Sequence, residues 1–407
     1  MLWTALQDRR FARLFYATLI SQIGTQIDRI ALLVLVYQQT RDALWVSLML
    51  GVQLAATLIL SPILSAWAEN QERRRLLVLS DLLRAPLVAL IPLVGLRSLP
   101  ALIGLLIALE ALRLLHDPVA QSVIPELIPP DRLDSANSLM LFTQRFAEVA
   151  FVGLAGILVA AVGPASAFWI DAASYALSGL LLLKLPRLEA AAPARVTYWV
   201  RVREGMGHIV GQPIIRRTIG TLVVAAMFGS MELVLGIVLA VSVLRVGSTG
   251  FGLMEAAIAL GAVIGLALVP SLTTRLPRER LFFFSLLAFG LFEASIGAWP
   301  NFFWVLIAYF MTGLLNMLFL IPARTLLQLH TPPELRTRVF AAFGALMRGA
   351  VLVGTIAGGA LEPALGAPLV IIVAGLFVTG VSAWALWRGG IVKQSAEADP
   401  SAEPRLA

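Results

Sequence analysis

Residues 125–133 read PELIPPDRL, and the paired prolines of this stretch recur 203 residues later, where residues 332–336 read PPELR. Arg145 and Arg348 are also separated by 203 residues. Each marker lies at a corresponding point among long apolar segments. Repetition at half the chain length indicates one structural unit used twice. The sequence therefore predicts two halves that run parallel in topology.

The composition is that of a protein surrounded by lipid. Hydrophobic residues make up 59% of the 407 residues, and the mean hydropathy is +0.88. Soluble domains are about 45–50% apolar and about 25% charged, whereas only 14% of this chain is charged. We therefore expect an all-α membrane protein embedded in the bilayer.

Twelve segments have about the 20 residues that a helix needs to cross the hydrocarbon. A pseudo-symmetric pair of six-helix bundles would account for them, with a substrate site between the bundles, as in secondary transporters. The predicted spans are residues 13–38, 43–66, 76–96, 99–120, 138–162, 166–185, 215–242, 250–272, 281–299, 301–323, 338–361 and 366–387.

The formal charge of +7 follows the predicted topology. Of the 31 Lys and Arg residues, 22 fall in the N-terminus, the even-numbered loops and the tail. The opposite side holds only Arg41, Arg97 and Arg245. Positive loops stay inside, so both termini should be cytoplasmic, in a bacterial-type inner membrane. The charge provides no basic face for nucleic acid.

Other chemistries lack their sequence signals. The chain has no cysteine, and its three histidines form no zinc motif. It has no phosphate-binding loop, because neither of its two lysines, Lys184 and Lys393, fits one. No nucleophile and base stand together at depth. We therefore expect neither an enzyme nor a resident metal or cofactor.

Four regions are predicted. Residues 1–185 form an N-terminal bundle and residues 215–387 a C-terminal bundle. Residues 186–214 link them and include an amphipathic helix at the membrane surface. The tail, 388–407, should be disordered.

At this level of detail the chain resembles the major facilitator superfamily, most closely its drug-efflux branch of macrolide and enterobactin exporters. The resemblance covers nearly the whole chain and rests on the order and spacing of several motifs. They are SQIG at 21–24, HDP at 116–118, PELIPPDRL at 125–133, GP at 163–164 and PELR at 333–336. It implies the major facilitator fold, a monomer, and proton-driven export.

The chain departs from that branch in two places. The loop between the second and third spans reads SAWAENQERR at 65–74, which keeps an acid and two arginines but lacks the family's glycine and first arginine. Glu69, Arg73 and Arg74 would form the conformational latch that the resemblance implies. In the fifth span, Phe151-Val152 replaces a Gly-Pro kink typical of antiporters.

Several intramembrane charges are candidates for proton or substrate binding, because a charge at the bilayer centre is costly unless it is paired or used. Asp28 and Glu232, 204 residues apart, form a pseudo-symmetric acidic pair that either handles protons or is neutralised by arginines. Glu110 and Arg113 share one helical face and either act in transport or form a self-satisfied pair.

Further candidates lie on the fifth, tenth and eleventh spans. Arg145 and Glu148 are spaced i and i+3 and can pair on one helical face. Arg348 has no acid within a turn. It would therefore either bind an anionic group of the substrate or form a salt bridge with an acid across the cavity. Asn316, with the aromatic residues Tyr309, Phe310 and Phe319 of the tenth span and Phe142 of the fifth, could give an amphiphile an apolar wall, or these aromatics could serve packing and lipid contact. Glu255 and Glu362 are expected to be solvated, and Glu293 has no assigned role. The list of candidate binding residues is Asp28, Glu110, Arg113, Arg145, Glu148, Glu232, Asn316 and Arg348.

The sequence predicts a secondary transporter that exports an amphiphilic small molecule (a drug, macrolide or siderophore-like compound) by alternating access, with protons moving inward. A lysophospholipid flippase or nutrient importer of the same fold, and a membrane scaffold that transports nothing, remain alternatives.

Overall fold

A computed structural model describes residues 2–68, 71–95, 97–129, 132–188 and 198–387. Every regular element in these ranges is a helix. In chain order they are η1 (Leu2–Gln7), α1 (Arg9–Thr40), α2 (Ala43–Ala68), α3 (Arg73–Gly95), α4 (Leu99–Ser122), α5 (Ile124–Leu127), α6 (Leu133–Leu182), α7 (Tyr198–Gly211), α8 (Pro213–Gly229), α9 (Glu232–Val238), η3 (Leu239–Val243), α10 (Gly247–Thr273), α11 (Arg278–Ala298), α12 (Phe302–Leu329), α13 (Pro333–Leu365) and α14 (Ala367–Trp387).

Eleven helical segments within the described ranges are long and apolar enough to cross a membrane. The predicted fifth and sixth spans lie on the single helix α6, which is broken at Gly163 (φ 80°, ψ 157°) directly before Pro164. Glycine reaches this positive φ without strain. The part of α6 before the break, Leu133–Val162, is itself longer than the roughly 20 residues that a crossing requires.

The predicted seventh span is interrupted. It comprises α8, α9 and the π-helical turn η3, with Ser230 and Met231 between α8 and α9. The Ser230 hydroxyl donates to the carbonyl of Met227 (3.0 Å) and is 3.1 Å from that of Val351 on α13. Short breaks of this kind occur in membrane helices where neighbouring groups satisfy the freed backbone.

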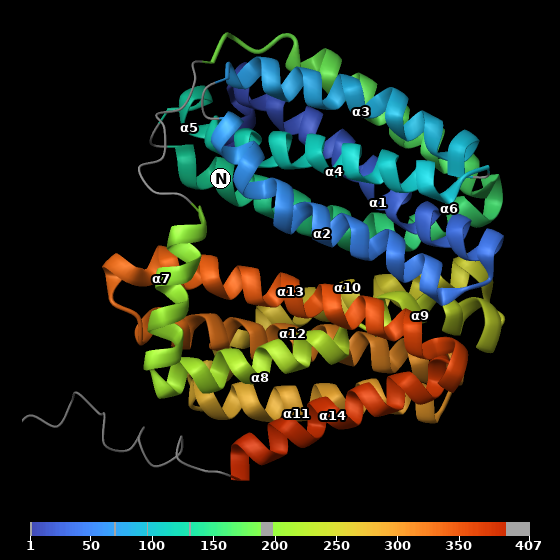
Figure 1. Ribbon diagram of the computed structural model, residues 1–407. Helices are drawn as coiled ribbons and strands as arrows, with labels where there is room; N and C mark the ends of the chain where they lie inside the picture. The colour runs from blue at the N-terminus through green and yellow to red at the C-terminus, as the bar shows by residue number, and fades with distance from the viewer. Residues whose placement is uncertain (1, 69–70, 96, 130–131, 189–197, 388–407) are drawn as a thin grey trace, which may run out of the picture.

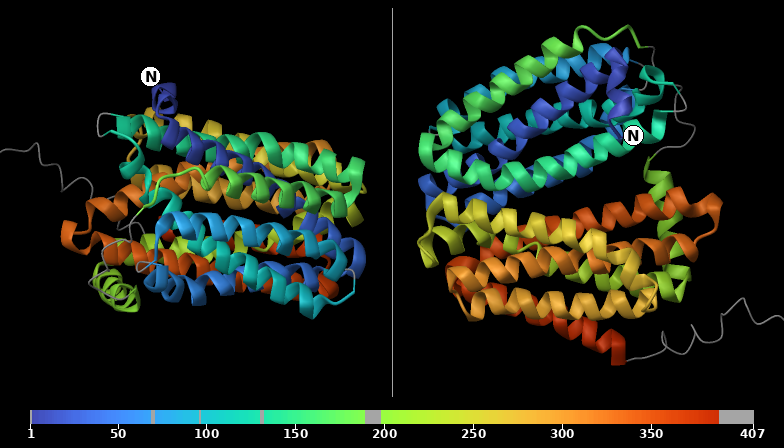
Figure 2. Two further views of the ribbon diagram at one scale, coloured as in Figure 1. Left: turned by 90° about the horizontal axis from the view of Figure 1, so that it is seen from above. Right: turned by 180° about the vertical axis from the view of Figure 1, so that it is seen from behind.

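The helices gather into two bundles that lie side by side (Figures 1 and 2). Helices α1–α6 form one bundle and α8–α14 the other, and α7 lies across one end of the second (Figure 1). The Arg338 guanidinium of α13 is 3.0 Å from Glu204 of α7. A Cβ on Gly205 would lie 2.0 Å from the Arg338 carbonyl, so α7 is docked tightly on the start of α13.

The bundles touch closely at the end where α1 ends and α2 begins, here called the α1–α2 end. A Cβ on Gly156 of α6 would lie 2.6 Å from the Cα of Gly252 on α10. A Cβ on Gly359 of α13 would lie 2.3 Å from the Ser47 hydroxyl of α2. Small residues let helix backbones approach this closely in membranes, so the two halves are sealed together at this end.

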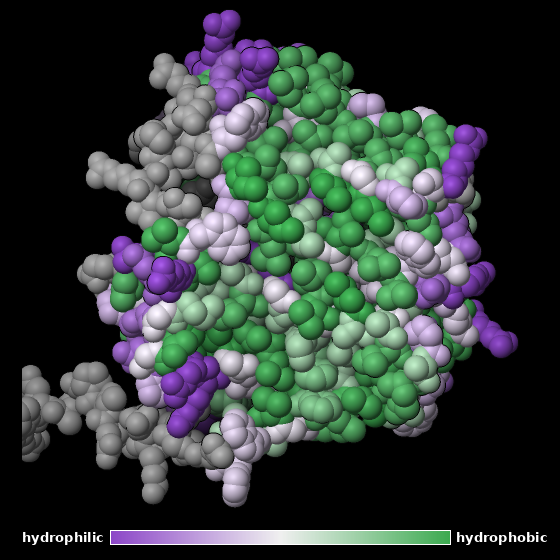
Figure 3. All heavy atoms as spheres, viewed as in Figure 1, coloured by the Kyte–Doolittle hydropathy of each residue, from purple (hydrophilic) through white to green (hydrophobic). Residues whose placement is uncertain are grey.

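The face of the molecule seen in Figure 3 is predominantly apolar over both bundles, and hydrophilic residues gather toward the two ends of the helices. Large apolar side chains are exposed on this surface, among them Leu180, Phe284 and Phe377. A wide apolar band between polar ends is the surface expected of a protein that spans a bilayer.

Candidate functional site

Two adjoining cavities lie inside the molecule and share the side chains of Thr25, Arg29, Arg84, Arg113 and Tyr175. The first, of about 270 Å³, lies between the halves, because it is lined by α1, α2 and α4 on one side and by Leu233, Glu255 and Val351 on the other. The second, of about 490 Å³, extends along α1 and α4 toward the α7 end.

Two of the predicted residues, Glu110 and Arg113, form a tight ion pair on α4. Arg113 donates to both carboxylate oxygens of Glu110, at 2.9 and 2.7 Å. Thr57 of α2 donates to the same carboxylate. Glu110 is buried, whereas the Arg113 side chain is 50% exposed. The pair therefore presents a compensated charge to the first cavity.

Asp28 lines the same cavity but has no such compensation. Its Oδ1 is buried without a hydrogen-bond partner among the described residues. One turn earlier on α1, Gly24 packs against α6 so closely that a Cβ would lie 2.1 Å from Asp171 Oδ1. Asp171 accepts a hydrogen bond from Ser174 (3.0 Å). Asp28 is thus the predicted acid that most needs a proton or a ligand.

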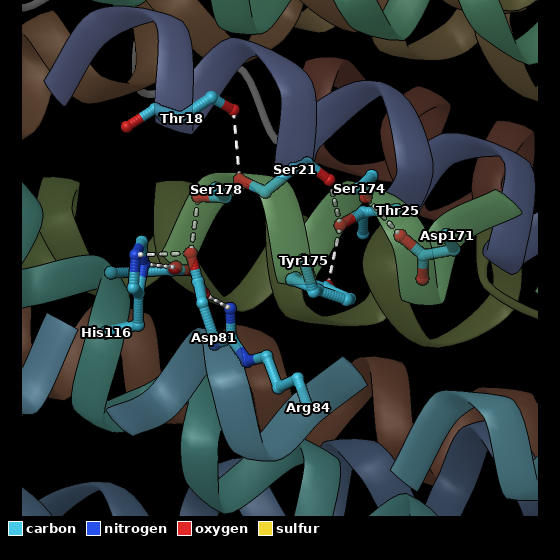
Figure 4. Close-up of polar contacts among 11 residues, drawn as sticks. Thr18, Ser21, Thr25, Asp81, Arg84, His116, Asp171, Ser174, Tyr175 and Ser178 are labelled. Carbon is cyan, nitrogen blue, oxygen red and sulfur yellow. Dashed lines mark hydrogen bonds and ion pairs between the residues drawn. The ribbon is translucent and has the colours of Figure 1, made fainter. Parts of the chain in front are cut away.

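A polar network crosses the N-terminal bundle beside the second cavity (Figure 4). Asp81 of α3 is fully buried and accepts from Arg84 (3.2 Å) and from Ser178 of α6 (2.6 Å). His116 of α4 bridges two acids, with Nε2 3.5 Å from Asp81 and Nδ1 3.2 Å from Asp117. His116 is therefore buried between carboxylates, where an end-of-helix histidine is more often solvated.

The network reaches the cavity wall through Tyr175 of α6. The Arg84 guanidinium lies 5.2 Å from the centre of the Tyr175 ring, a favourable cation–π distance. The Tyr175 hydroxyl is 2.9 Å from the Thr25 hydroxyl of α1, and Thr25 in turn donates to the Ser21 carbonyl (2.8 Å). Helices α1, α3, α4 and α6 are thereby joined around the second cavity.

The expectation that Glu255 is solvated is wrong. Its carboxylate lines the first cavity and lies 3.4 Å from Arg29 of the other half. The C-terminal bundle also holds Glu232. Gly236 lies between Glu232 and Tyr309: a Cβ on Gly236 would be 3.5 Å from Glu232 Oε1 and 2.9 Å from the Tyr309 phenol oxygen. The pseudo-symmetric acids Asp28 and Glu232 therefore have different surroundings.

The remaining predicted residues lie away from these contacts or outside the description. Arg348 lies on α13 one turn before Val351, which lines the first cavity. Asn316 is half-buried on α12 and is not among the described side chains that line the two cavities. Arg145 and Glu148 lie on α6, but their side chains are outside the described part.

Arg73 and Arg74, two of the three residues of the predicted latch, contact residues of their own half in this conformation. Arg73 pairs with Glu126 of α5, and Arg74 donates to the Leu183 carbonyl at 2.7 Å. Both contacts stay within the N-terminal half. Glu69 lies outside the described residues, so its part in a latch stays a prediction.

The sequence reasoning missed Asp81, Ser178, Tyr175 and Thr57. Asp81 and Arg84 have the i, i+3 spacing that also marked Glu110 and Arg113, and that spacing could have revealed them. Ser178 lies 97 residues from Asp81, and no local pattern indicates such a partner.

Comparison with known proteins identifies the family and the fold. The model of the family described as transmembrane secretion effector matches residues 1–404. The multidrug efflux pump Tap of Mycolicibacterium fortuitum is 25% identical over 367 residues, which cover 87% of this chain and 89% of the pump. The uncharacterized MFS-type transporter y4rN of Sinorhizobium fredii is 26% identical over 259 residues, 62% of this chain and 63% of that protein.

Solved structures share the fold at lower identity. The nucleoside transporter NupG superposes with a TM-score of 0.74 at 12% identity and covers 93% of this chain and 98% of its own. A bacterial homologue of the lysosomal transporter Spinster, inward-facing and unoccupied, gives a TM-score of 0.74 at 14% identity and covers 93% and 96%. Because the family model spans nearly the whole chain, the protein belongs to the transmembrane secretion effector family and is a multi-pass membrane transporter of the major facilitator type.

Proposed function

We propose that the protein exports an amphiphilic small molecule across the bacterial inner membrane, in exchange for protons, with both termini in the cytoplasm. The observation that carries the proposal is Asp28. Its carboxylate lies in a membrane-buried cavity between the halves, and Oδ1 lacks a partner among the described residues. Such a group requires either a proton or a positively polarised substrate group.

The contrast with Glu110 supports Asp28 as the exchanging acid. Glu110 is already neutralised by two hydrogen bonds from Arg113. Asp28 would release its proton when a donor group of the substrate binds in its place, and regain one after the substrate has left. One charge crossing 100 mV yields about 2.3 kcal/mol, and a pH unit yields about 1.4 kcal/mol. One proton per neutral substrate could thus sustain a gradient of a few hundredfold.

The closed α1–α2 end bears on which side of the membrane the cavity would face. The positive loops of the predicted topology assign the α7 end to the cytoplasm. The cavity along α1 and α4 extends toward that end, so the conformation would be one that accepts cargo from the cytoplasm. The Tap relatives are named as multidrug efflux pumps, which favours outward transport of drug-like molecules.

The test uses proteoliposomes with an imposed pH gradient, an internal pH dye and a panel of cationic, neutral and anionic amphiphiles. We expect at least one amphiphile to trigger proton movement in the natural protein, and Asp28→Asn to abolish it. Glu362→Gln, at the far end of α13, is the matched acid-to-amide control and should behave like the natural protein.

The other outcomes would name a different function. If no amphiphile moves protons while the protein is folded, proton-coupled export is refuted. Transport of radiolabelled lysophospholipid without proton movement would then establish a flippase, and accumulation directed inward would establish an importer. Proton movement that survives Asp28→Asn would contradict the assignment of Asp28.

A further inference from the structure

Glu293 is a buried acid in the C-terminal bundle that the proposed exchange at Asp28 does not use. It lies on α11, five residues before the helix ends, and is 2% exposed. Neither carboxylate oxygen has a hydrogen-bond partner among the described residues. Its Oε2 faces the last residue of α8, Gly229, where a Cβ would be 3.7 Å away.

The helices packed against α11 supply no cation to this carboxyl. They are α8, α10, α12 and α14. Helix α14 contains no charged residue, and α10 contributes only the acid Glu255. The nearer arginine of α8, Arg217, is 12 residues before Gly229, or about 18 Å along the helix.

The other arginines are no closer. Arg216 precedes Arg217 on α8, and Arg324 of α12 follows Tyr309 by 15 residues, about 22 Å of helix rise. The charges of α11 itself, Arg278, Glu279 and Arg280, lie at its opposite end. An ionised Glu293 would therefore remain uncompensated inside the bilayer, which is among the most unfavourable placements for a charge.

Acidic and phenolic groups connect Glu293 to the cavity between the halves. Glu232 begins α9 three residues after Gly229, which Glu293 Oε2 faces, so about one helical turn separates Glu232 from that point of contact. Glu232 also faces Tyr309 across Gly236. On the far side, a Cβ on Gly236 would lie 3.4 Å from the ring of Phe251 on α10, which is one turn before Glu255, a residue that lines the first cavity. The sequence of groups leads from the cavity to Glu293 through the interrupted helix.

We propose that Glu293 is a proton-binding residue of the C-terminal half and that Glu232 passes protons between it and Glu255 at the cavity. A proton is the fitting ligand because a metal ion would need several oxygens at one point. Within the described residues no group of three or more acidic or histidine side chains could hold a metal ion. The claim that the Glu293 proton takes part in transport rests on the proposed function. The claim that Glu293 holds a proton does not.

The presence of the proton is tested by infrared spectroscopy of the purified protein in nanodiscs at neutral pH. A protonated carboxyl has a C=O stretching band distinct from that of a carboxylate. We expect Glu293→Gln to remove one such band and Glu362→Gln to leave that band unchanged. If Glu293→Gln does not fold, Glu293→Asp keeps the acid and should shift the band. An unchanged acid band in the folded variants would overturn the proposal.

The route is tested by transferring the protein into D₂O and following the isotope shift of the Glu293 band. We expect Glu232→Gln to slow this exchange at least tenfold, because the intermediate acid is lost. An unchanged exchange rate would refute the route through Glu232. Both infrared measurements need no substrate, so they decide on Glu293 even if the liposome experiment refutes proton-coupled export.

Discussion

At the scale of single residues, Asp81 accepts hydrogen bonds from Arg84 and Ser178, lies 3.5 Å from His116 Nε2 and has no exposed surface. Asp81→Ala would leave Arg84 and His116 buried without this acceptor, and removal of one partner from a buried ionic network costs about 3–5 kcal/mol. We expect a loss of that size in the free energy of unfolding, measured by denaturant titration in detergent. Asp81→Asn keeps the shape of the side chain and one oxygen acceptor, so its free energy of unfolding should fall less than that of Asp81→Ala. A loss below about 1 kcal/mol for the alanine variant would contradict this account.

The Glu110–Arg113 pair predicts a non-additive effect. Glu110→Gln should destabilise the protein by about 1–3 kcal/mol, because donors that now meet a carboxylate would meet an amide. Adding Arg113→Gln should restore part of the loss, since contacting residues are coupled by about 0.5–3 kcal/mol. The four proteins of the cycle are compared by the same unfolding titration, and additive losses would show that the two side chains are energetically independent.

The sequence could predict local pairs but few of the contacts between helices. Spacing of i and i+3 identified Glu110 with Arg113, because one turn of helix fixes that distance. The contacts of Asp81 with Ser178 and of Thr25 with Tyr175 depend on how α1, α3 and α6 pack, and helix packing is not encoded in spacing. The sequence left Glu293 without an assigned role, and its lack of hydrogen-bond partners among the described residues became visible only with the helices around α11 in place.

At the scale of helices, α10 and α12 pack closely against each other where glycines lie at their crossing. A Cβ on Gly261 would lie 1.9 Å from the Phe310 carbonyl, and one on Gly313 would lie 2.0 Å from the Ile258 carbonyl. These clashes are with backbone, so the helices must separate to admit a methyl group. Gly261→Ala should lower the free energy of unfolding by about 1–3 kcal/mol or more.

The control for Gly261 is Gly104 of α4, where a Cβ would meet nothing within 4 Å. Gly104→Ala replaces glycine with a better helix former and should be neutral or slightly stabilising. Thermal unfolding of both variants in the same detergent makes the comparison. Equal midpoints would mean that the α10–α12 crossing adapts without loss.

Helix positions followed from the sequence because a bilayer fixes the length of each apolar segment. The turn at Gly163-Pro164 was predicted, and the structure places a non-helical glycine there. The break between α8 and α9 was not predicted, since the segments on both sides of Ser230 are apolar apart from Glu232 and no proline lies near it. At the break, Ser230 contacts the Val351 carbonyl of α13, and Gly354 of α13 approaches so closely that a Cβ would lie 1.7 Å from the Met227 carbonyl.

At the scale of the whole molecule, alternating access requires the α1–α2 end to open and reseal. The seal depends on glycines: Gly156 meets Gly252, and Gly359 meets Ser47. A larger side chain at Gly156 would hold α6 away from α10, so the end could no longer close. We expect Gly156→Leu to shift the molecule toward the conformation open at this end and to reduce transport strongly, whatever the substrate.

The absence of cysteine from the chain makes this shift measurable. Gln39→Cys and Leu361→Cys place spin labels on exposed sites of the two halves at the α1–α2 end. We expect double electron–electron resonance to report one short-distance population in the labelled parent and a longer one when Gly156→Leu is added. Gly104→Leu, which has free space around it, should retain the short distance. If Gly156→Leu also retains it in folded protein, closure of this end does not depend on the contact between α6 and α10.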